Sequence, residues 1–277
     1  MVPIPPGLRI WIAALLCAGS LAAVTSARQS SDPPPQESAA LTRAREYVET
    51  FITKLSNVVA DETYEQQRTR QRRRRELKSE FVLVSLPGSG GWLQLRGVYE
   101  VDGKSVLDRQ ERLAALLGGG SGPDGLTRAL TLTRDNARYN LGEIGTLNVP
   151  LVALSFLQSR HRAHFEFVSG PIDRKSGAAA RLLEFRERGR RMYPGRPVRG
   201  HIWVDDNTGV VLQTELLIGY AQRPNQILTF FKPDADLRVS VPVEMREWYG
   251  FLDYEVTSRA TYGRFRAIGP TTCEEIS

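Results

Sequence analysis

The sequence predicts an α+β fold in which an antiparallel sheet packs on an N-terminal helix and a short helical insert. Strand-like stretches lie on both sides of one helical segment, and the β-α-β alternation of a parallel sheet is missing. From His164 onward the chain is almost wholly strand-like, and Asp205–Gly209 has the composition of a hairpin turn. Both observations favour strands that pair with their neighbours along the chain.

The first residues indicate export. Arg9 precedes the apolar run Ile10–Ala23, and the small residues Thr25-Ser26-Ala27 follow, which is the pattern of a signal peptide over residues 1–27. We therefore expect the mature protein to work in the periplasm or outside the cell. The alternative is that this segment is retained as a membrane anchor.

Composition fits one domain with a sizeable core. The apolar fraction is 41%, and 37 basic residues face 31 acidic ones, a mild positive surplus. Cleavage after Ala27 removes Cys17 and leaves Cys273, so we expect no intrachain disulfide. We also expect a monomer.

The domain boundaries follow from local composition. The polar, proline-rich residues 28–38 predict a disordered linker, residues 39–269 a single domain, and residues 270–277 a flexible tail. Apolar residues at steps of three and four predict a helix from about Ala39 to Ala60.

A block of strands, a block of helical pieces and a second block of strands follow that helix. Strand signals begin at Tyr64, and the turn Asp102-Gly103 ends the first group of strands. Three helical pieces are expected at about Asp108–Leu117, Asp124–Arg138 and Val149–Gln158, the first two separated by the Gly-rich loop Gly118–Gly125. The expected strands are Phe81–Leu86, Trp92–Val101, Phe165–Ser169, Ala180–Arg188, Gly200–Asp205, Val210–Tyr220, Gln226–Lys232, Val239–Tyr249 and Val256–Arg266.

An arginine segment is the sharpest charge feature: Arg70, Arg72, Arg73, Arg74 and Arg75. A basic cluster of this kind marks contact with an anionic surface, or else a solvated hairpin balanced by the acids around it. Outside the cytoplasm the anions would be lipid headgroups or acidic glycans. No nucleic-acid-binding motif accompanies the segment, so we expect no nucleic acid partner.

Catalytic and metal-binding patterns are not recognisable. The stretch from Gly97 to Gly103-Lys104-Ser105 has one residue too many for a phosphate loop and reads as a hairpin. Ser89 and Ser121 lack the Gly-x-Ser-x-Gly context of a hydrolase nucleophile. We therefore predict no catalytic residues, no cofactor and no enzymatic activity; a hydrolase is the weakest alternative.

Histidines and acidic pairs do not form a metal motif either. His161 and His164 would point to opposite faces of a strand, and His201 is distant in sequence. The acidic pairs Asp205-Asp206 and Asp234/Asp236 fall in turns without the ligand pattern of a calcium loop. We predict no metal site.

Several segments together carry a family resemblance. They are Val98–Lys104 with Asp108–Leu113, Ala137–Gly142 with Leu147–Leu151, Gly200–Asp205 with Thr208-Gly209, and Val241–Tyr249 with Ala260–Arg266. From about Ala39 to Ala267 the chain resembles a group of uncharacterised exported bacterial proteins of the kind found in acidobacteria-like soil organisms. More remotely, the strand with Trp203-Val204-Asp205, its Thr-Gly turn and the strands that follow are similar to the LolA/RseB-like half-barrel.

The half-barrel resemblance implies a curved antiparallel sheet wrapped over helices, in proteins that carry lipoproteins or sense envelope lipids. It implies a concave apolar surface that binds a lipid or a lipoprotein acyl chain. The alternative is an envelope interaction or scaffold protein with an anionic surface or a protein as partner. The large apolar residues expected to line the cleft, or else simply to form the core, are Phe81, Leu83, Trp92, Leu95, Trp203, Leu216, Phe230, Trp248 and Phe251.

Overall fold

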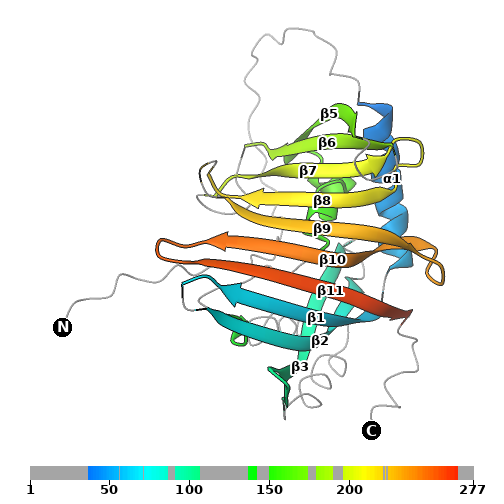
Figure 1. Cartoon of the computed structure of the whole chain (residues 1–277). Coiled ribbons are helices and arrows are strands. Elements are labelled where there is room, and N and C mark those ends of the chain that lie inside the picture. Colours follow the sequence, from blue (N-terminus) through cyan, green and yellow to red (C-terminus); the bar gives the residue numbers. More distant parts are fainter. Residues whose placement is uncertain are drawn as a thin grey trace, which may run out of the picture. The chain divides into compact units, whose positions relative to one another are not determined.

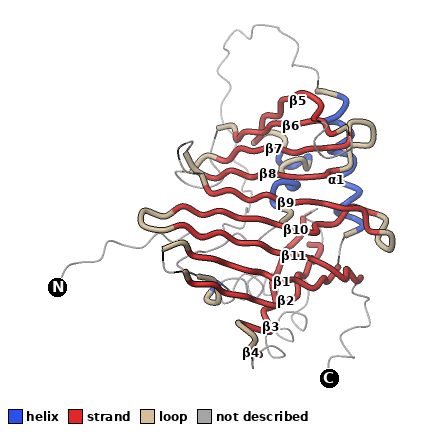
Figure 2. Tube along the Cα trace, in the orientation of Figure 1, coloured by secondary structure: helices blue, strands red, loops and turns tan. Residues whose placement is uncertain are grey.

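The computed structural model describes residues 37–55, 57–70, 72–86, 91–106, 137–141, 150–173, 179–189, 196–220, 222 and 224–267. In this part of the chain the fold is one eleven-stranded antiparallel sheet with helix α1 lying against it (Figure 1). Figure 2 shows how strongly strands dominate over helices. The predicted α+β class with an antiparallel sheet and an N-terminal helix is confirmed. The predicted signal peptide, most of the linker and the C-terminal tail lie outside the described residues.

Helix α1 (Ala39–Lys54) begins at Ser38, whose Oγ accepts a hydrogen bond from the Leu41 amide at 3.3 Å. Its apolar stripe is buried against the sheet. The helix ends at Lys54 and not near Ala60, so that part of the prediction is wrong. Asn57 adopts a left-handed backbone (φ 55°), and the β-branched Val58 and Val59 that follow belong to the first strand.

The last strand of the described chain pairs with the first. The strands are β1 (Val58–Arg68), β2 (Arg73–Leu86), β3 (Gly91–Val101), β4 (Lys104–Ser105), β5 (Phe165–Asp173), β6 (Ala180–Glu187), β7 (Val198–Asp205), β8 (Val211–Ile218), β9 (Asn225–Asp234), β10 (Val239–Gly250) and β11 (Glu255–Ala267). Their order is β4-β3-β2-β1-β11-β10-β9-β8-β7-β6-β5. Every neighbouring pair except β1 and β11 is consecutive in sequence, so the sheet is open, with edges at β4 and β5.

Each strand sends alternate side chains to two different surfaces of the sheet. We call the surface that packs on α1 the inner face and the opposite one the outer face. The inner face carries buried residues from most strands, for example Tyr64 on β1, Leu77 on β2, Ile202 on β7 and Met245 on β10. The outer face is mainly polar and carries surface ion pairs, so the inner face holds the main core.

The helical insert is short where the structure describes it. Helix α4 (Val152–Ser155) lies within the predicted helix Val149–Gln158 but is much shorter, and a single 3₁₀ turn (Ser159–His161) follows it. Phe156 stacks on Phe165 of β5, with ring centroids 4.2 Å apart, and so fixes the insert on the inner face. The predicted helix Asp108–Leu117, the Gly-rich loop and nearly all of Asp124–Arg138 lie outside the described residues.

Helices long and apolar enough to cross a membrane are absent from the described part of the chain.

Candidate functional site

The nine residues predicted to line a cleft lie on two different faces. Phe81, Leu83 and Leu216 are buried on the inner face, and Trp92 packs beside them with its ring 6.3 Å from that of Phe51. Four others lie on the outer face, and Phe251 lies in the β10–β11 turn: Leu95, Trp203, Phe230, Trp248 and Phe251. The structure therefore brings only the first four into one lining.

A buried polar cluster, which the sequence did not reveal, occupies the inner face of β1, β2 and β3. Arg96 holds Glu62 with two hydrogen bonds, of which Nη2 to Oε1 measures 2.6 Å, and Ser79 Oγ donates to Oε2 of the same carboxylate at 2.6 Å. Glu62 is 2% exposed and Arg96 8%. Although burial opposes it, the adjacent Glu62 carboxylate raises the pKa of Arg96, so the guanidinium keeps its charge in this buried ion pair.

The cluster continues onto β10 through two tyrosines. Tyr64 donates to Glu247 Oε2 at 2.6 Å and Tyr249 to Oε1 at 2.7 Å. Burial raises the pKa of Glu247, although the tyrosine hydrogen bonds oppose the shift. Burial also raises the pKa of Tyr64 and Tyr249 well above the usual range, so both remain hydroxyl donors. The Arg96 guanidinium lies 4.1 Å from the centroid of the Tyr64 ring and links the two halves.

The inner face is therefore amphipathic. Its β5–β9 part is lined mainly by apolar residues beneath α1 and α4, whereas on β1–β3, β10 and β11 charged and hydroxyl groups lie beside core residues such as Phe81 and Leu83. Gln66 extends the polar part, donating to Tyr64 Oη at 3.2 Å and accepting from the Leu141 amide at 2.8 Å. The alternation Glu62-x-Tyr64-x-Gln66 on one strand is the sequence signal that could have indicated a polar stripe.

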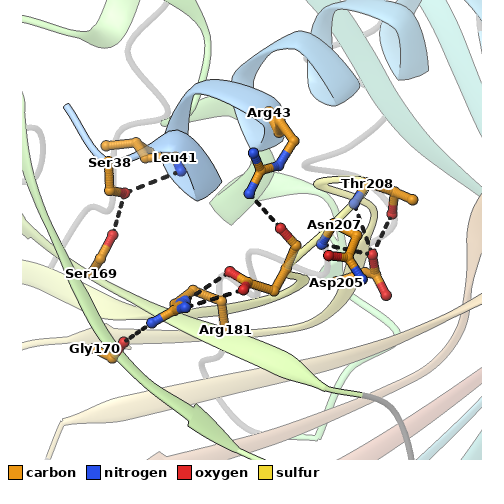
Figure 3. Close-up of polar contacts among 10 residues, drawn as sticks. Ser38, Leu41, Arg43, Ser169, Gly170, Arg181, Asp205, Asn207 and Thr208 are labelled. Atoms are coloured by element: carbon orange, nitrogen blue, oxygen red, sulfur yellow. Dashed lines mark hydrogen bonds and ion pairs between the residues drawn. The ribbon is translucent and has the colours of Figure 1, made fainter.

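Helix α1 is joined to the sheet at its N-terminal end by a small set of polar contacts (Figure 3). Arg43 donates to the carbonyl oxygen of Asp206, and Arg181 binds the Asp206 carboxylate with two hydrogen bonds of 2.8 and 3.1 Å. Ser38 Oγ contacts Ser169 Oγ of the edge strand β5. These contacts are half-buried or exposed, so water competes for them.

A glycine allows this end of the helix to approach the β7–β8 turn closely. Gly209 has φ +74°, and a Cβ built there would lie 2.4 Å from the carbonyl carbon of Arg43. No other residue type fits this contact without movement of the helix or the turn. The turn Asp205–Gly209 predicted from sequence is therefore also the place where α1 docks.

The arginine segment forms the tip of the β1–β2 hairpin, and its members have different environments. Arg75 is turned inward, with Nη1 donating to the Tyr139 carbonyl at 2.7 Å and Nε 2.9 Å from Asp102. Arg74 pairs with Glu65 at 3.0 Å while 66% exposed. Arg70, Arg72 and Arg73 are exposed.

The outer face carries one histidine–carboxylate pair. His201 Nδ1 lies 2.5 Å from Glu215 Oε2, and Trp203 is the nearest aromatic neighbour at 5.6 Å between centroids. The hydrogen bond to Glu215 raises the pKa of His201. Within the described ranges, no serine or cysteine side chain is hydrogen-bonded to a histidine, and no group of three or more His, Cys, Asp or Glu side chains is placed to hold a metal ion.

Comparison with known proteins gives likeness in structure only. No family model and no curated protein matches the sequence. A DUF1329 family protein from Desulfovibrio piger matches at 10% identity and a TM-score of 0.44, covering 87% of this chain and 98% of that chain. A LolA superfamily protein from Nitrosomonas europaea matches at 11% identity and a TM-score of 0.38, covering 85% and 94%.

A third match is to the MucA/MucB complex of Pseudomonas aeruginosa, at 12% identity and a TM-score of 0.24, covering 82% of this chain and 99% of that chain. LolA-superfamily structures are thus among those similar to this chain, as the sequence resemblance led us to expect. At these identities and scores the likeness carries no functional conclusion, so the function must be argued from this chain's own residues.

Proposed function

We propose that this protein is an exported, non-enzymatic module that binds an apolar or amphipathic ligand, such as a lipid or a lipoprotein acyl chain, between α1 and the inner face of the sheet. The strongest support is that only a small number of helical side chains cover the apolar part of that face in the described part of the chain. One long helix, α1, and the short α4 contribute the side chains that fill it. Displacing α1 would open a continuous apolar surface.

Exchange of the helix for a ligand is energetically close to balanced. The stripe of α1, with its C-cap residue Leu55, contributes four large apolar side chains, Leu41, Val48, Phe51 and Leu55, each 0–6% exposed. Burial of such side chains stabilises by about 1.5–3 kcal/mol each, so together about 6–12 kcal/mol. An acyl chain of about ten methylenes contributes about 8 kcal/mol at ~0.8 kcal/mol per methylene. A lipid tail is therefore an adequate substitute for the helix stripe.

The ends of α1 suit such a displacement. At its C-terminal end the chain turns through Leu55 and the left-handed Asn57 before entering β1, which gives the helix a pivot. At its N-terminal end the Arg43–Asp206 and Ser38–Ser169 contacts are polar and solvent-accessible, so they exchange for water at small cost. We infer that α1 swings from its C-terminal end.

The polar part of the inner face favours an amphipathic ligand over a hydrocarbon. Phe81, Leu83, Trp92 and Leu216 would contact the apolar chain. Arg96 and the two tyrosines on Glu247 lie on the same face as these apolar residues, and Arg96 is paired with Phe81 across β2 and β3, so they would bind the polar headgroup of such a ligand.

Purification of the full-length protein from a bacterial periplasm, followed by extraction and lipid mass spectrometry, tests this function. We expect a bound lipid or acylated species at a fixed ratio to protein. A fluorescent fatty acyl probe should bind to the delipidated protein and be displaced by the unlabelled fatty acid. A protein that carries no lipid and does not bind the probe would contradict the proposal.

A further inference from the structure

Two hairpin tips lie side by side at one end of the strands, away from the edge strands β4 and β5. The described part of the β1–β2 tip (residues 69, 70 and 72) and the β10–β11 turn (251–254) are held together by Thr69. Its amide donates to the Glu255 carbonyl at 3.0 Å, and its Oγ1 accepts from the Glu255 amide at 3.1 Å. Figure 1 shows both tips at the end of the strands opposite the one where α1 lies. We call these two tips together the hairpin edge.

The β10–β11 turn exposes a leucine to solvent, and the residues beside that leucine are packed. Leu252 is 99% exposed. On either side of it the rings of Phe251 and Tyr254 stack, with centroids 4.5 Å apart and planes 17° apart, and the Phe251 amide donates to the Tyr254 carbonyl at 2.9 Å. Both rings pack on Tyr249 and Val256. The leucine is therefore displayed by an ordered turn.

Arginines of the β1–β2 hairpin lie to one side of the turn that carries this leucine. The Arg68 guanidinium lies 3.7 Å from the centroid of the Tyr254 ring, and Arg70 is 71% exposed with Asp253 at 3.8 Å. Arg72 and Arg73 are exposed and have no acidic partner among the described residues. With Arg74, five arginines at and beside the two tips face four acids, Glu65, Glu76, Asp253 and Glu255, so this region is positively charged.

We propose that the hairpin edge docks on a lipid bilayer surface that carries anionic phospholipids. The leucine would enter the boundary between headgroups and acyl chains, and the arginines would bind the phosphates around it. An acidic glycan or another polyanion would use the arginines but would have no use for a fully exposed leucine. The combination of one exposed apolar side chain with a neighbouring cluster of arginines therefore favours a bilayer, and this inference does not depend on ligand binding at the inner face.

Flotation of the full-length protein with vesicles tests the docking. The vesicles are phosphatidylcholine alone, or phosphatidylcholine mixed with phosphatidylglycerol. We expect binding only to the mixed vesicles, weakening as salt rises from ~0.1 to ~0.5 M because exposed charges are screened. Leu252→Ser should weaken binding about tenfold, since one leucine side chain leaves the bilayer. The double variant Arg72→Asn with Arg73→Ser should weaken it about twenty-five-fold, since each arginine near an anionic surface contributes about fivefold.

Matched control variants distinguish binding through the hairpin edge from binding through other parts of the surface. Val168→Ser removes another exposed apolar side chain, 55% exposed, on edge strand β5. Lys232→Ser with Arg238→Asn removes two charges at the opposite end of the strands; Arg238, like Arg72, sits in a turn with positive φ, which asparagine tolerates. Both controls should bind mixed vesicles as the unaltered protein does.

Equal binding to both kinds of vesicle, or no binding to either, would overturn the proposal. A Leu252→Ser variant that binds like the unaltered protein would also overturn it, because the arginines alone would then account for binding and the leucine would not enter the bilayer. Thermal unfolding of each variant confirms that it is folded. Uptake of the fluorescent acyl probe in solution without vesicles should be unchanged in the edge variants, which keeps failure of docking distinct from failure of ligand binding.

Discussion

Tyr64 on β1 donates its hydroxyl hydrogen bond to Oε2 of Glu247 on β10, 2.6 Å away, across the intervening strand β11. The small side chain of Ala260 on β11 pairs with Tyr64 on one side and Met245 on the other, which leaves room for the ring to cross. This bond joins the strands of the first hairpin to the C-terminal strands through buried polar groups. Because such groups are costly when unpaired, the cluster fixes how the first hairpin packs beside the C-terminal strands.

Removing Arg96 should be strongly destabilising. Arg96→Met leaves the Glu62 carboxylate buried without its cation, and loss of one partner of a buried pair costs about 3–5 kcal/mol. Urea unfolding measures the loss. The double variant Glu62→Leu with Arg96→Met removes both charges and should recover much of it. A single variant as stable as the unaltered protein would show that Glu62 is not held as a charged group.

Glu247 should make stability depend on pH in a defined direction. Burial raises its folded pKa above the unfolded value, so its favourable contribution is present at low pH and is lost as pH rises through the folded pKa. The difference in free energy of unfolding between the unaltered protein and Glu247→Gln should therefore fall from about pH 4 to pH 8. The comparison cancels the other carboxylates. A difference that rises over this range would contradict the assigned direction.

The contact between Gly209 and α1 predicts that alanine is tolerated less well at residue 209 than at residue 103. Gly103→Ala and Gly209→Ala both place an alanine at positive φ, which costs about 1–2 kcal/mol. A Cβ at residue 103 meets nothing within 4 Å, whereas at residue 209 it meets the Arg43 backbone. Gly209→Ala should therefore be the more destabilising of the two in urea. It should also increase amide hydrogen exchange within Ala39–Lys54, which Gly103→Ala should not.

Much of the strand content could be predicted, because alternation and turn residues act locally. The end of the first helix could not. Val58 and Val59 continue the three- and four-residue spacing of the helix stripe, and only their pairing with β11 and β2 places them in a strand. Tertiary contacts made far away in the sequence decided that boundary.

The site was less accessible to sequence reasoning than the fold. Trp203 is an instructive case, because Ile202 and Val204 point inward, so alternation alone sends Trp203 to the outer face. Arg96 and Leu95 show the reverse problem, since the charged residue lies inside and the leucine outside. No local rule predicts that arrangement, because the partner of Arg96 is Glu62 on another strand and that of Tyr64 is Glu247, 183 positions away.

The most direct test of the central claim, that a ligand enters when α1 leaves the inner face, is a reversible disulfide that ties the helix to the sheet. We call this disulfide the latch. The contacting Oγ atoms of Ser38 and Ser169 place two side chains where a disulfide can form. In a Cys273→Ser background, the variant Ser38→Cys with Ser169→Cys would fix the N-terminal end of α1 to β5, while its C-terminal end stays joined to β1. Ser38→Cys alone, treated with the same oxidant, is the control for loss of the helix cap.

Binding of the fluorescent acyl probe is measured before and after reduction of the latch. We predict that the oxidised double variant takes up the probe at least about tenfold more slowly than the control, the factor that corresponds to about 1.4 kcal/mol of added barrier, and that reduction restores uptake. Uptake by the oxidised, latched protein at the rate of its reduced form would contradict the claim that the ligand replaces α1 on the inner face.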